Sequence, residues 1–344
     1  MPTSRVDRFV QSSPSVDNYW RAIILFGRNV ASYKFALGRS LLDLADQGTE
    51  SVSLEELAVP FSKYLTEHLA TVDTQGTSAQ SRFLTACREF NNGGLSHGQL
   101  IEATARLGFV NVIDAFHVVG PEETPVRFFA DERDSNRGIS LTDDLHRLRD
   151  HYQYRNLPAE VEARWRLVEN SWHLGIPSRA VEVTHDSGLL VIDSGLKRTT
   201  LTGCRDALNG YQKGHCFYCS RPIQVTPTDD GDPVHVDHLI PFRLGREPEF
   251  TGINLNGVWN LVLACSACNL SKHDYVPHRR FVELLERRNN YLISSHHPLR
   301  GTLITQTGTT VDERRSYLQT VWQTAENLRI ATWEPSEQVE EQRW

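Results

Sequence analysis

The chain has 344 residues, of which 39% are hydrophobic and 23% charged, a balance typical of an ordinary globular protein of two or three domains. No apolar run approaches the roughly 18 residues of a membrane span, and the N-terminus lacks the apolar core of a signal peptide, so we expect a cytoplasmic protein without membrane contact. The net charge of −7 argues against a broad nucleic-acid-binding surface, because phosphate contacts need Lys and Arg.

The first third of the sequence predicts helices. Residues 1–16 are polar and are expected to form a loose lead-in. Ser53 followed by Glu56 is the pattern of a capping box, in which each side chain bonds the backbone of the other. Apolar residues recur at helical spacing elsewhere in this region. Helices are expected at residues 18–46, 53–71, 80–90 and 97–107. We therefore predict a helical N-terminal domain at residues 1–108.

The rest of the chain mixes short strands with helices. Residues 116–119 and 126–129 are expected to pair as strands, and residues 180–193 form a hairpin around Asp186-Ser187-Gly188. Helices are expected at residues 141–152, 158–174, 200–212, 281–292 and 316–330. The predicted fold class is mainly α with small β elements (α+β). The predicted segments are a mixed connecting region at 109–195, a zinc-stabilised domain at 196–300 and a C-terminal helical extension at 301–344.

Four of the six cysteines form two Cys-x-x-Cys pairs, which are Cys216 with Cys219 and Cys265 with Cys268. The two-residue gap lets both thiolates of a pair reach one ion, and four sulfurs complete the closed tetrahedral shell of a structural Zn²⁺. The alternative is four unrelated buried cysteines, which is improbable in a chain with so few. The remaining cysteines, Cys87 and Cys204, are expected to be small core residues.

Between and just after these pairs lie residues suited to metal-assisted phosphodiester hydrolysis. His238 is the candidate general base, since a neutral imidazole takes a proton near pH 7. Asp237 and Asn269 offer oxygen ligands to a hard cation, which favours Mg²⁺ or Mn²⁺ as a second, catalytic ion. Asn260 is expected to hold the histidine loop, and Lys272 to bind a phosphate or stabilise developing negative charge.

Neighbouring residues of a regular strand point to opposite faces, so Asp237 and His238 serve one site only if the strand ends or bends there. Pro241, three residues later, makes such an ending plausible. Each residue alone is weak evidence, because a lone Asp-His pair is more often structural. The order and spacing carry the prediction: Cys-x-x-Cys, Asp-His-x-x-Pro, Asn, and then Cys-x-x-Cys-Asn-x-x-Lys.

This order resembles the HNH endonuclease family, whose core is the ββα-metal fold, over about Gly214 to His273. The resemblance implies that Asp237 is the metal ligand and His238 the general base of the first strand. It implies that Asn260 and Asn269 match the second and third letters of the family name, and that Lys272 matches a lysine common in the family. The reaction it implies is a one-metal cut that leaves 5′-phosphate and 3′-hydroxyl ends. A polar insertion at 223–232 departs from the pattern and leaves the motif intact.

Several neighbouring residues admit two interpretations. His235 is either an extra metal ligand or, more often in such positions, a solvated histidine. Basic residues after the second cysteine pair either follow a DNA backbone or form a solvated helix face with Glu283 and Glu286. The candidates for substrate contact are Lys272, His273, Arg279 and Arg280, with Arg287 and Arg288 further along the helix.

The leading functional prediction is a metal-dependent DNA endonuclease, plausibly in bacterial restriction or anti-phage defence. Residues 201–300 contain 11 Lys and Arg against 10 Asp and Glu, so this segment by itself has few charges to read DNA. Target choice is therefore expected to come from the other regions or from a partner protein, and a double-strand cut favours a homodimer. The alternatives are a non-catalytic zinc-stabilised binding module and an RNA-cutting nuclease.

Overall fold

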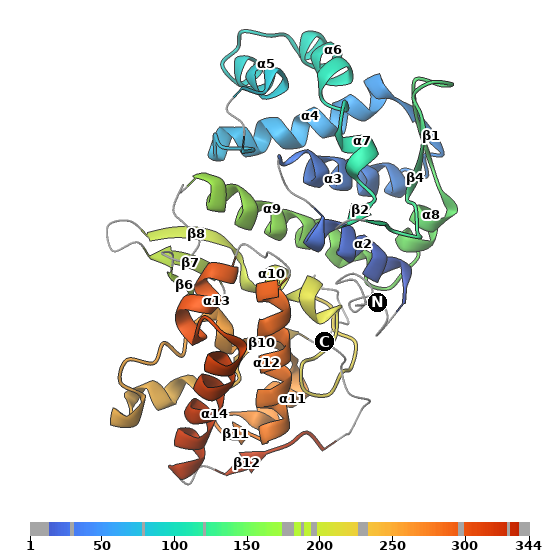
Figure 1. Cartoon of the computed structure of the whole chain (residues 1–344). Helices are drawn as coiled ribbons and strands as arrows, with labels where there is room; N and C mark the ends of the chain where they lie inside the picture. The colour runs from blue at the N-terminus through green and yellow to red at the C-terminus, as the bar shows by residue number, and fades with distance from the viewer. Residues whose placement is uncertain are drawn as a thin grey trace. The chain divides into compact units, whose positions relative to one another are not determined.

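The computed structural model describes residues 14–27, 31–77, 80–119, 122–173, 182–186, 189–193, 198–225, 233–294, 299–328 and 331–336 (Figure 1). The chain divides into two compact units, Met1–Gly175 and Ile176–Trp344. Helices predominate and the sheets have two or three strands, so the predicted mainly α class with small β elements is confirmed. None of the helices in the described ranges is both long and apolar enough to cross a membrane.

The N-terminal unit is built mainly from helices. They are α2 (Val16–Phe26), α3 (Tyr33–Asp46), α4 (Leu54–Thr71), α5 (Arg82–Asn91), α6 (His97–Leu107), α7 (Val112–Ala115), α8 (Asp143–Arg149) and α9 (Leu157–His173), with a short 3₁₀ helix η1 (Tyr154–Asn156). The capping box predicted at Ser53 and Glu56 is present at the start of α4. Most of the predicted lead-in at residues 1–16 lies outside the described residues.

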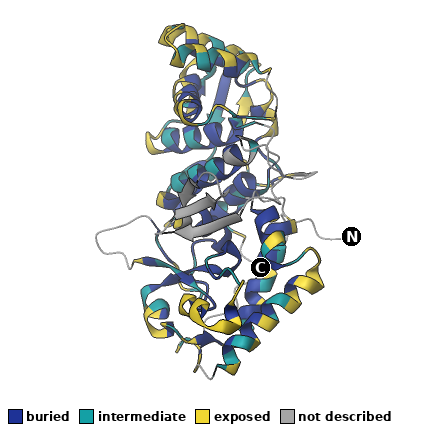
Figure 2. Ribbon diagram, turned by 90° about the vertical axis from the view of Figure 1, so that its left-hand side faces the viewer, coloured by how far each residue is buried: buried dark blue, intermediate teal, exposed yellow. Residues whose placement is uncertain are grey.

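One hydrophobic core joins these helices. Its buried residues run from Trp20 in α2 to Val168 in α9, so residues 109–168 contribute to the same core as the helices before residue 108. Cys87 is fully buried there, as predicted, whereas the side chain of Cys204 lies outside the described residues. Figure 2 colours the buried residues dark blue, and they line the inner faces of the helices.

The predicted pairing of residues 116–119 with 126–129 is wrong. β2 (Val118–Val119) instead pairs with β3 (Glu122–Glu123). β4 (Phe129–Glu132) pairs with β5 (Gly138–Leu141), which also pairs with the distant β1 (Ser51–Ser53). A Cβ at Gly138 would lie 1.9 Å from the carbonyl oxygen of Val52, so the close approach of β1 depends on this glycine. That contact is between residues far apart in sequence, which local patterns do not reveal.

The C-terminal unit contains small sheets and helices. Its strands are β6 (Glu182–Asp186), β7 (Leu189–Asp193), β8 (Arg198–Gly203), β9 (Val234–His238), β10 (Leu261–Cys265), β11 (Val276–Pro277) and β12 (Thr332–Trp333). Its helices are α10 (Cys204–Gln212), α11 (Ser266–Lys272), α12 (Arg279–Ser294), α13 (Arg300–Thr307) and α14 (Val311–Asn327), with short 3₁₀ helices η2 (Phe242–Arg246), η3 (Pro248–Phe250) and η4 (Val258–Asn260).

The hairpin predicted at residues 180–193 is confirmed as β6 and β7. The helix predicted at 200–212 begins later, because Thr200 and the residues up to Gly203 extend β8, which pairs with β7. β-Branched threonines favour a strand when a neighbouring strand is available.

An antiparallel hairpin followed by a helix forms the centre of this unit. β9 pairs with β10 so that His238 lies opposite Leu261 and Asp237 opposite Val262. The free edge of β10 is also paired: the side-chain amide of Gln212 in α10 both donates to and accepts from the backbone of Leu263. α11 begins directly after β10, with Cys265 as its N-cap residue. β9, β10 and α11 therefore have the ββα order implied by the sequence resemblance.

A fully buried arginine ties α12 to this centre. Arg288 donates to the carbonyl oxygens of Leu261, Val258 and Trp259, at the junction of η4 and β10. Arg288 was one of the basic residues that the sequence allowed to follow a DNA backbone. These contacts exclude that role, because a guanidinium that bonds buried carbonyls cannot also reach a phosphate. Arg287, the preceding residue, is exposed.

Candidate active site and metal centres

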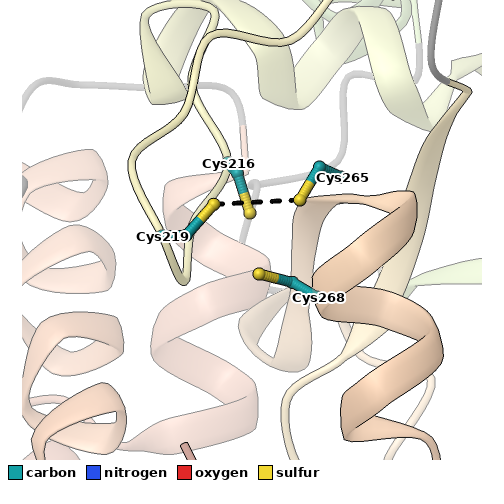
Figure 3. A group of neighbouring side chains, drawn as sticks. All are labelled: Cys216, Cys219, Cys265 and Cys268. Atoms are coloured by element: carbon teal, nitrogen blue, oxygen red, sulfur yellow. Dashed lines mark hydrogen bonds between the residues drawn. The ribbon is translucent and has the colours of Figure 1, made fainter. Parts of the chain in front are cut away.

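Four cysteine side chains of the C-terminal unit converge. Their sulfur atoms all lie within 4.8 Å of one another, and all four residues are buried. Cys216 and Cys219 come from the loop after α10, whereas Cys265 and Cys268 come from the start of α11, and all four point inward (Figure 3). The Sγ atoms of Cys219 and Cys265 are 3.8 Å apart.

The loop that carries the first pair is a tight knuckle. The backbone amide of Cys216 donates to Arg221 at 2.8 Å, and that of Ser220 donates to Cys216 at 3.0 Å. Ser220 has a φ of 57°, which turns the chain back and leaves both thiols on one side. Four buried sulfurs at this spacing fit a structural Zn²⁺, since the ion would meet four protein ligands and keep no open position.

Asp237 lies near the end of β9 and has two partners. Its Oδ2 accepts a hydrogen bond from the hydroxyl of Tyr218 at 2.5 Å. The ammonium of Lys272 in α11 lies 3.2 Å from Oδ1 and 3.1 Å from Oδ2. Burial and the neighbouring carboxylate raise the pKa of Tyr218 well above its usual value, so the hydroxyl keeps its proton and donates it. The carboxylate is therefore held on both sides.

Lys272 is fully buried. Its ammonium also donates to the carbonyl oxygen of His238 at 2.8 Å, so it joins α11 to the last two residues of β9. From the sequence, Lys272 was expected to contact a phosphate. The structure instead places its ammonium between protein groups, away from any surface open to a phosphate. In this position Lys272 orients Asp237 and fixes the end of the strand.

His238 is the last residue of β9, which satisfies the condition that the strand end after Asp237. The imidazole is partly buried, with Nε2 at 2.9 Å from Oδ1 of Asn256. An amide oxygen only accepts hydrogen bonds, so Nε2 is the donor in this pair. The ring of Phe242, at a centroid distance of 5.4 Å, covers another side of the imidazole and is itself 54% exposed.

Asn260, in η4, is fully buried and binds the loop that follows the histidine. Its Oδ1 accepts from the amide of Ile240 at 2.8 Å, and its Nδ2 donates to the carbonyl oxygens of Ile240 and Leu255, each at 2.9 Å. These three bonds agree with the expected role in holding the histidine loop. The amide therefore bonds the backbone beyond His238, and its part in the reaction stays a prediction.

Replacing Asn260 by alanine leaves three buried backbone groups without partners. We expect the variant to lose about 3 kcal/mol of unfolding free energy, since each unsatisfied buried group costs about 1–3 kcal/mol in full and part of that is recovered by relaxation. Denaturant unfolding measures the loss. The control is Asn327→Ala on the exposed face of α14, expected to shift stability by less than about 0.5 kcal/mol. Equal stability of the two variants would contradict the role given to Asn260.

Asn269 lies in α11, one helical turn before Lys272, and is partly exposed. Residues three apart share a helix face, so we expect the Asn269 amide to lie on the same side as the lysine that contacts Asp237. Within the described ranges its side chain has no hydrogen-bond partner. Among the residues that the structure describes, Lys272 is the one donor to Oδ1 of Asp237, which leaves that oxygen a second lone pair. An available amide oxygen and an available carboxylate lone pair fit the ligand preference of a hard divalent cation.

The other candidates lie at the surface or in local contacts. His235 bonds Ser266 at the start of α11, with 3.1 Å between Nε2 and Oγ. His273 is 75% exposed beside Asp274. The guanidinium groups of Arg279 and Arg280 lie 3.3 Å from Glu283 and 3.5 Å from Glu334, respectively. These pairings are those of a solvated helix face, and phosphate contact by these residues stays a prediction.

The sequence analysis did not identify Tyr218 and Asn256, which hydrogen-bond the site residues Asp237 and His238. Tyr218 lies inside the first Cys-x-x-Cys pair, and Asn256 lies in the loop before η4. Neither sits in the ordered pattern of Asp, His, Asn and Lys. A tyrosine between two candidate metal ligands was the available signal, because a knuckle leaves little freedom for the side chains within it.

Comparison with known proteins bears on the central region of this unit. Residues 216–275 match the family model of the HNH endonuclease. The comparisons with curated proteins and with solved structures each give no match. The matched range spans the knuckle, β9, β10 and α11, including the four clustered cysteines. Residues 216–275 of this chain are therefore an HNH endonuclease domain.

Proposed function

We propose that this domain hydrolyses phosphodiester bonds of DNA with one divalent cation, Mg²⁺ or Mn²⁺, and His238 as the general base. A nuclease of the HNH type is what the family match supports. DNA as the substrate, Mg²⁺ as the ion and a place in bacterial restriction or anti-phage defence are the finer parts of the proposal.

One observation carries the proposal: the contact of Lys272 with both of the last two residues of β9. Because its ammonium bonds the Asp237 carboxylate and the His238 carbonyl, the helix that carries Asn269 is fastened to the strand that carries the candidate base and ligand. A binding module stabilised by zinc has no need of this arrangement. Hydrolysis at one phosphate needs it, since base and ligands must be held to within fractions of an ångström.

The residues then have distinct tasks. The imidazole of His238 takes the proton of the attacking water, and the carboxamide of Asn256 holds the ring through Nε2. Asn260 fixes the backbone of the loop after the strand, so that the imidazole keeps its direction. The exposed ring of Phe242 beside His238 offers a surface on which a base of the substrate can stack.

The ion would be held by Asp237 and Asn269, with substrate and water in the other positions. When bound, such a cation stabilises negative charge on the phosphate and on the leaving oxygen. Lys272 and Tyr218 contribute by fixing the direction of the Asp237 carboxylate.

A cleavage assay with the zinc-loaded chain tests the proposal. Supercoiled plasmid DNA and an RNA of matching sequence are incubated with and without added Mg²⁺. In the reactions without Mg²⁺ the ion is omitted and no chelator is added, because a chelator would also remove the structural zinc. We expect Mg²⁺-dependent cutting of DNA, with 5′-phosphate ends that a ligase rejoins, and none by the His238→Ala variant.

The other results identify which part of the proposal fails. Cutting of RNA but not of DNA would show that the proposed substrate is wrong, whereas the proposed hydrolysis of a phosphodiester bond would stand. No cutting of either substrate by the wild type, with or without Mg²⁺, would leave the zinc-stabilised binding module as the function.

A further inference from the structure

Tyr218 connects three parts of the C-terminal unit. It lies between the zinc-ligating candidates Cys216 and Cys219 and is almost fully buried. Its hydroxyl bonds Asp237, which lies 19 residues away on β9. A short hydrogen bond from a buried hydroxyl to a carboxylate fixes the direction of both groups.

The ring of Tyr218 is held by residues outside the family match. Phe281 of α12 meets it edge-on at a centroid distance of 5.2 Å, and Trp333 of β12 does so at 5.0 Å. Edge-to-face packing of this kind is directional, so it constrains the ring and not only its volume. Both contacts come from the chain after residue 275, where the match ends.

Trp333 is itself anchored. It pairs with Pro277 in the parallel bridge of β11 and β12, and its carbonyl oxygen accepts from the amide of His278 at 2.9 Å. The indole of Trp322 in α14 donates to the carbonyl oxygen of Pro277 at 2.9 Å. The C-terminal segment, which comprises β11, α12, α14 and β12, therefore packs against the ring of Tyr218 in a fixed arrangement.

We propose that Tyr218 is a positioning residue for Asp237, and that the C-terminal segment acts on the active site through its contact with the tyrosine ring. The hydroxyl sets the carboxylate direction that a divalent cation would meet, and Trp333 sets the direction of the hydroxyl. The cysteine knuckle and the C-terminal segment thus both act on the carboxylate of Asp237. This inference rests on the proposed role of Asp237 in holding the catalytic ion.

Tyr218→Phe removes only the hydroxyl and keeps the ring in its packing. The matched control is Tyr275→Phe, which removes an exposed tyrosine hydroxyl just after α11. Trp333→Leu removes the ring contact that directs the Tyr218 hydroxyl but retains the hydroxyl group itself. The zinc content and thermal midpoint of each variant are measured first, so that loss of the knuckle is separated from loss of the hydrogen bond.

The main measurement is Mn²⁺ binding by titration calorimetry on the zinc-loaded chain, which does not depend on cleavage. We expect Tyr218→Phe to weaken Mn²⁺ binding by about 10–100-fold, the usual effect of losing a group that orients a ligand. Tyr275→Phe should bind as wild type, and Trp333→Leu should show a smaller loss. The double variant Tyr218→Phe/Trp333→Leu should bind no more weakly than Tyr218→Phe alone, because both changes act through one hydroxyl.

Wild-type Mn²⁺ affinity in Tyr218→Phe, with zinc retained, would overturn the inference while leaving the nuclease proposal intact. Additive losses in the double variant would overturn the part assigned to Trp333. A wild-type chain that neither binds Mn²⁺ nor cuts DNA would remove the proposed function, and the inference with it. If Tyr218→Phe lost zinc, Trp333→Leu would serve as the test in its place. Weakened Mn²⁺ binding by Trp333→Leu would support the inference, and wild-type Mn²⁺ binding would overturn it.

Discussion

His238→Ala is expected to lower the cleavage rate by about 10²–10⁴-fold, the contribution of a positioned general base. The imidazole ends β9 beside Asp237 and is oriented by Asn256, and alanine has no group that takes a proton. The rate is measured as single-turnover nicking of plasmid DNA at saturating Mg²⁺. This regime reports the chemical step and not product release.

The variant should remain folded, with its zinc bound. His238 is only partly buried, so its removal creates no large cavity, and a shift of about 1 kcal/mol or less in stability is expected. The control is His278→Ala, an exposed histidine of the same unit, which should cut as wild type. A His238→Ala variant that cuts within twofold of wild type would exclude this imidazole as the base.

Cys216→Ala and Cys268→Ala are each expected to abolish stoichiometric zinc binding and to unfold the HNH domain at moderate temperature. The four sulfurs bring the knuckle and the start of α11 together, and an ion bound by all four would link these two segments. Structural zinc contributes on the order of 10 kcal/mol to the folding of small zinc domains, so loss of one thiolate exceeds the effect of an ordinary core substitution. Zinc content and thermal unfolding measure the two effects.

The N-terminal unit should be spared by these substitutions. Its core consists of its own residues, from Trp20 to Val168, so hydrogen exchange is expected to show lasting protection in α3 and α4 when β9 and β10 lose theirs. Cys87→Ala in that core is the control, and it should leave the zinc content at one ion per chain. Full zinc content in Cys216→Ala or Cys268→Ala would show that the cysteines are not the zinc ligands.

Features that depend on neighbouring residues were predictable from the sequence. The capping box of Ser53 and Glu56, the hairpin of β6 and β7, and the two cysteine knuckles are each formed within a few residues. In each case the interacting groups are side chains or backbone segments only a few residues apart, so the local pattern specifies the geometry.

Predictions failed where a distant partner decides the structure. β5 pairs with β4 and with the far β1, and Thr200 extends β8 because β7 lies beside it. The spacing of apolar residues shows which face of a helix or strand is buried. It does not show which other strand has a free edge nearby with which to pair. That information is distributed over the whole chain.

The candidate site divides in the same way. Asp237, His238, Asn260 and Asn269 were singled out from the sequence, because hydrolysis at one phosphate would need a base and hard oxygen ligands. Only the tertiary structure decided that the Lys272 ammonium turns inward to a carboxylate 35 residues away. It likewise decided that Arg288 bonds carbonyls 27 to 30 residues away.

The sequence by itself therefore specified two Cys-x-x-Cys pairs suited to one ion and the residue pattern of an HNH domain, from which a nuclease is proposed. The tertiary structure decided which charged groups are buried, and so which of them orient the site and which remain at the surface. The physical reason is that a charge enters the interior only where partners compensate its desolvation, and the partners of Lys272 and Arg288 arrive from distant strands and loops.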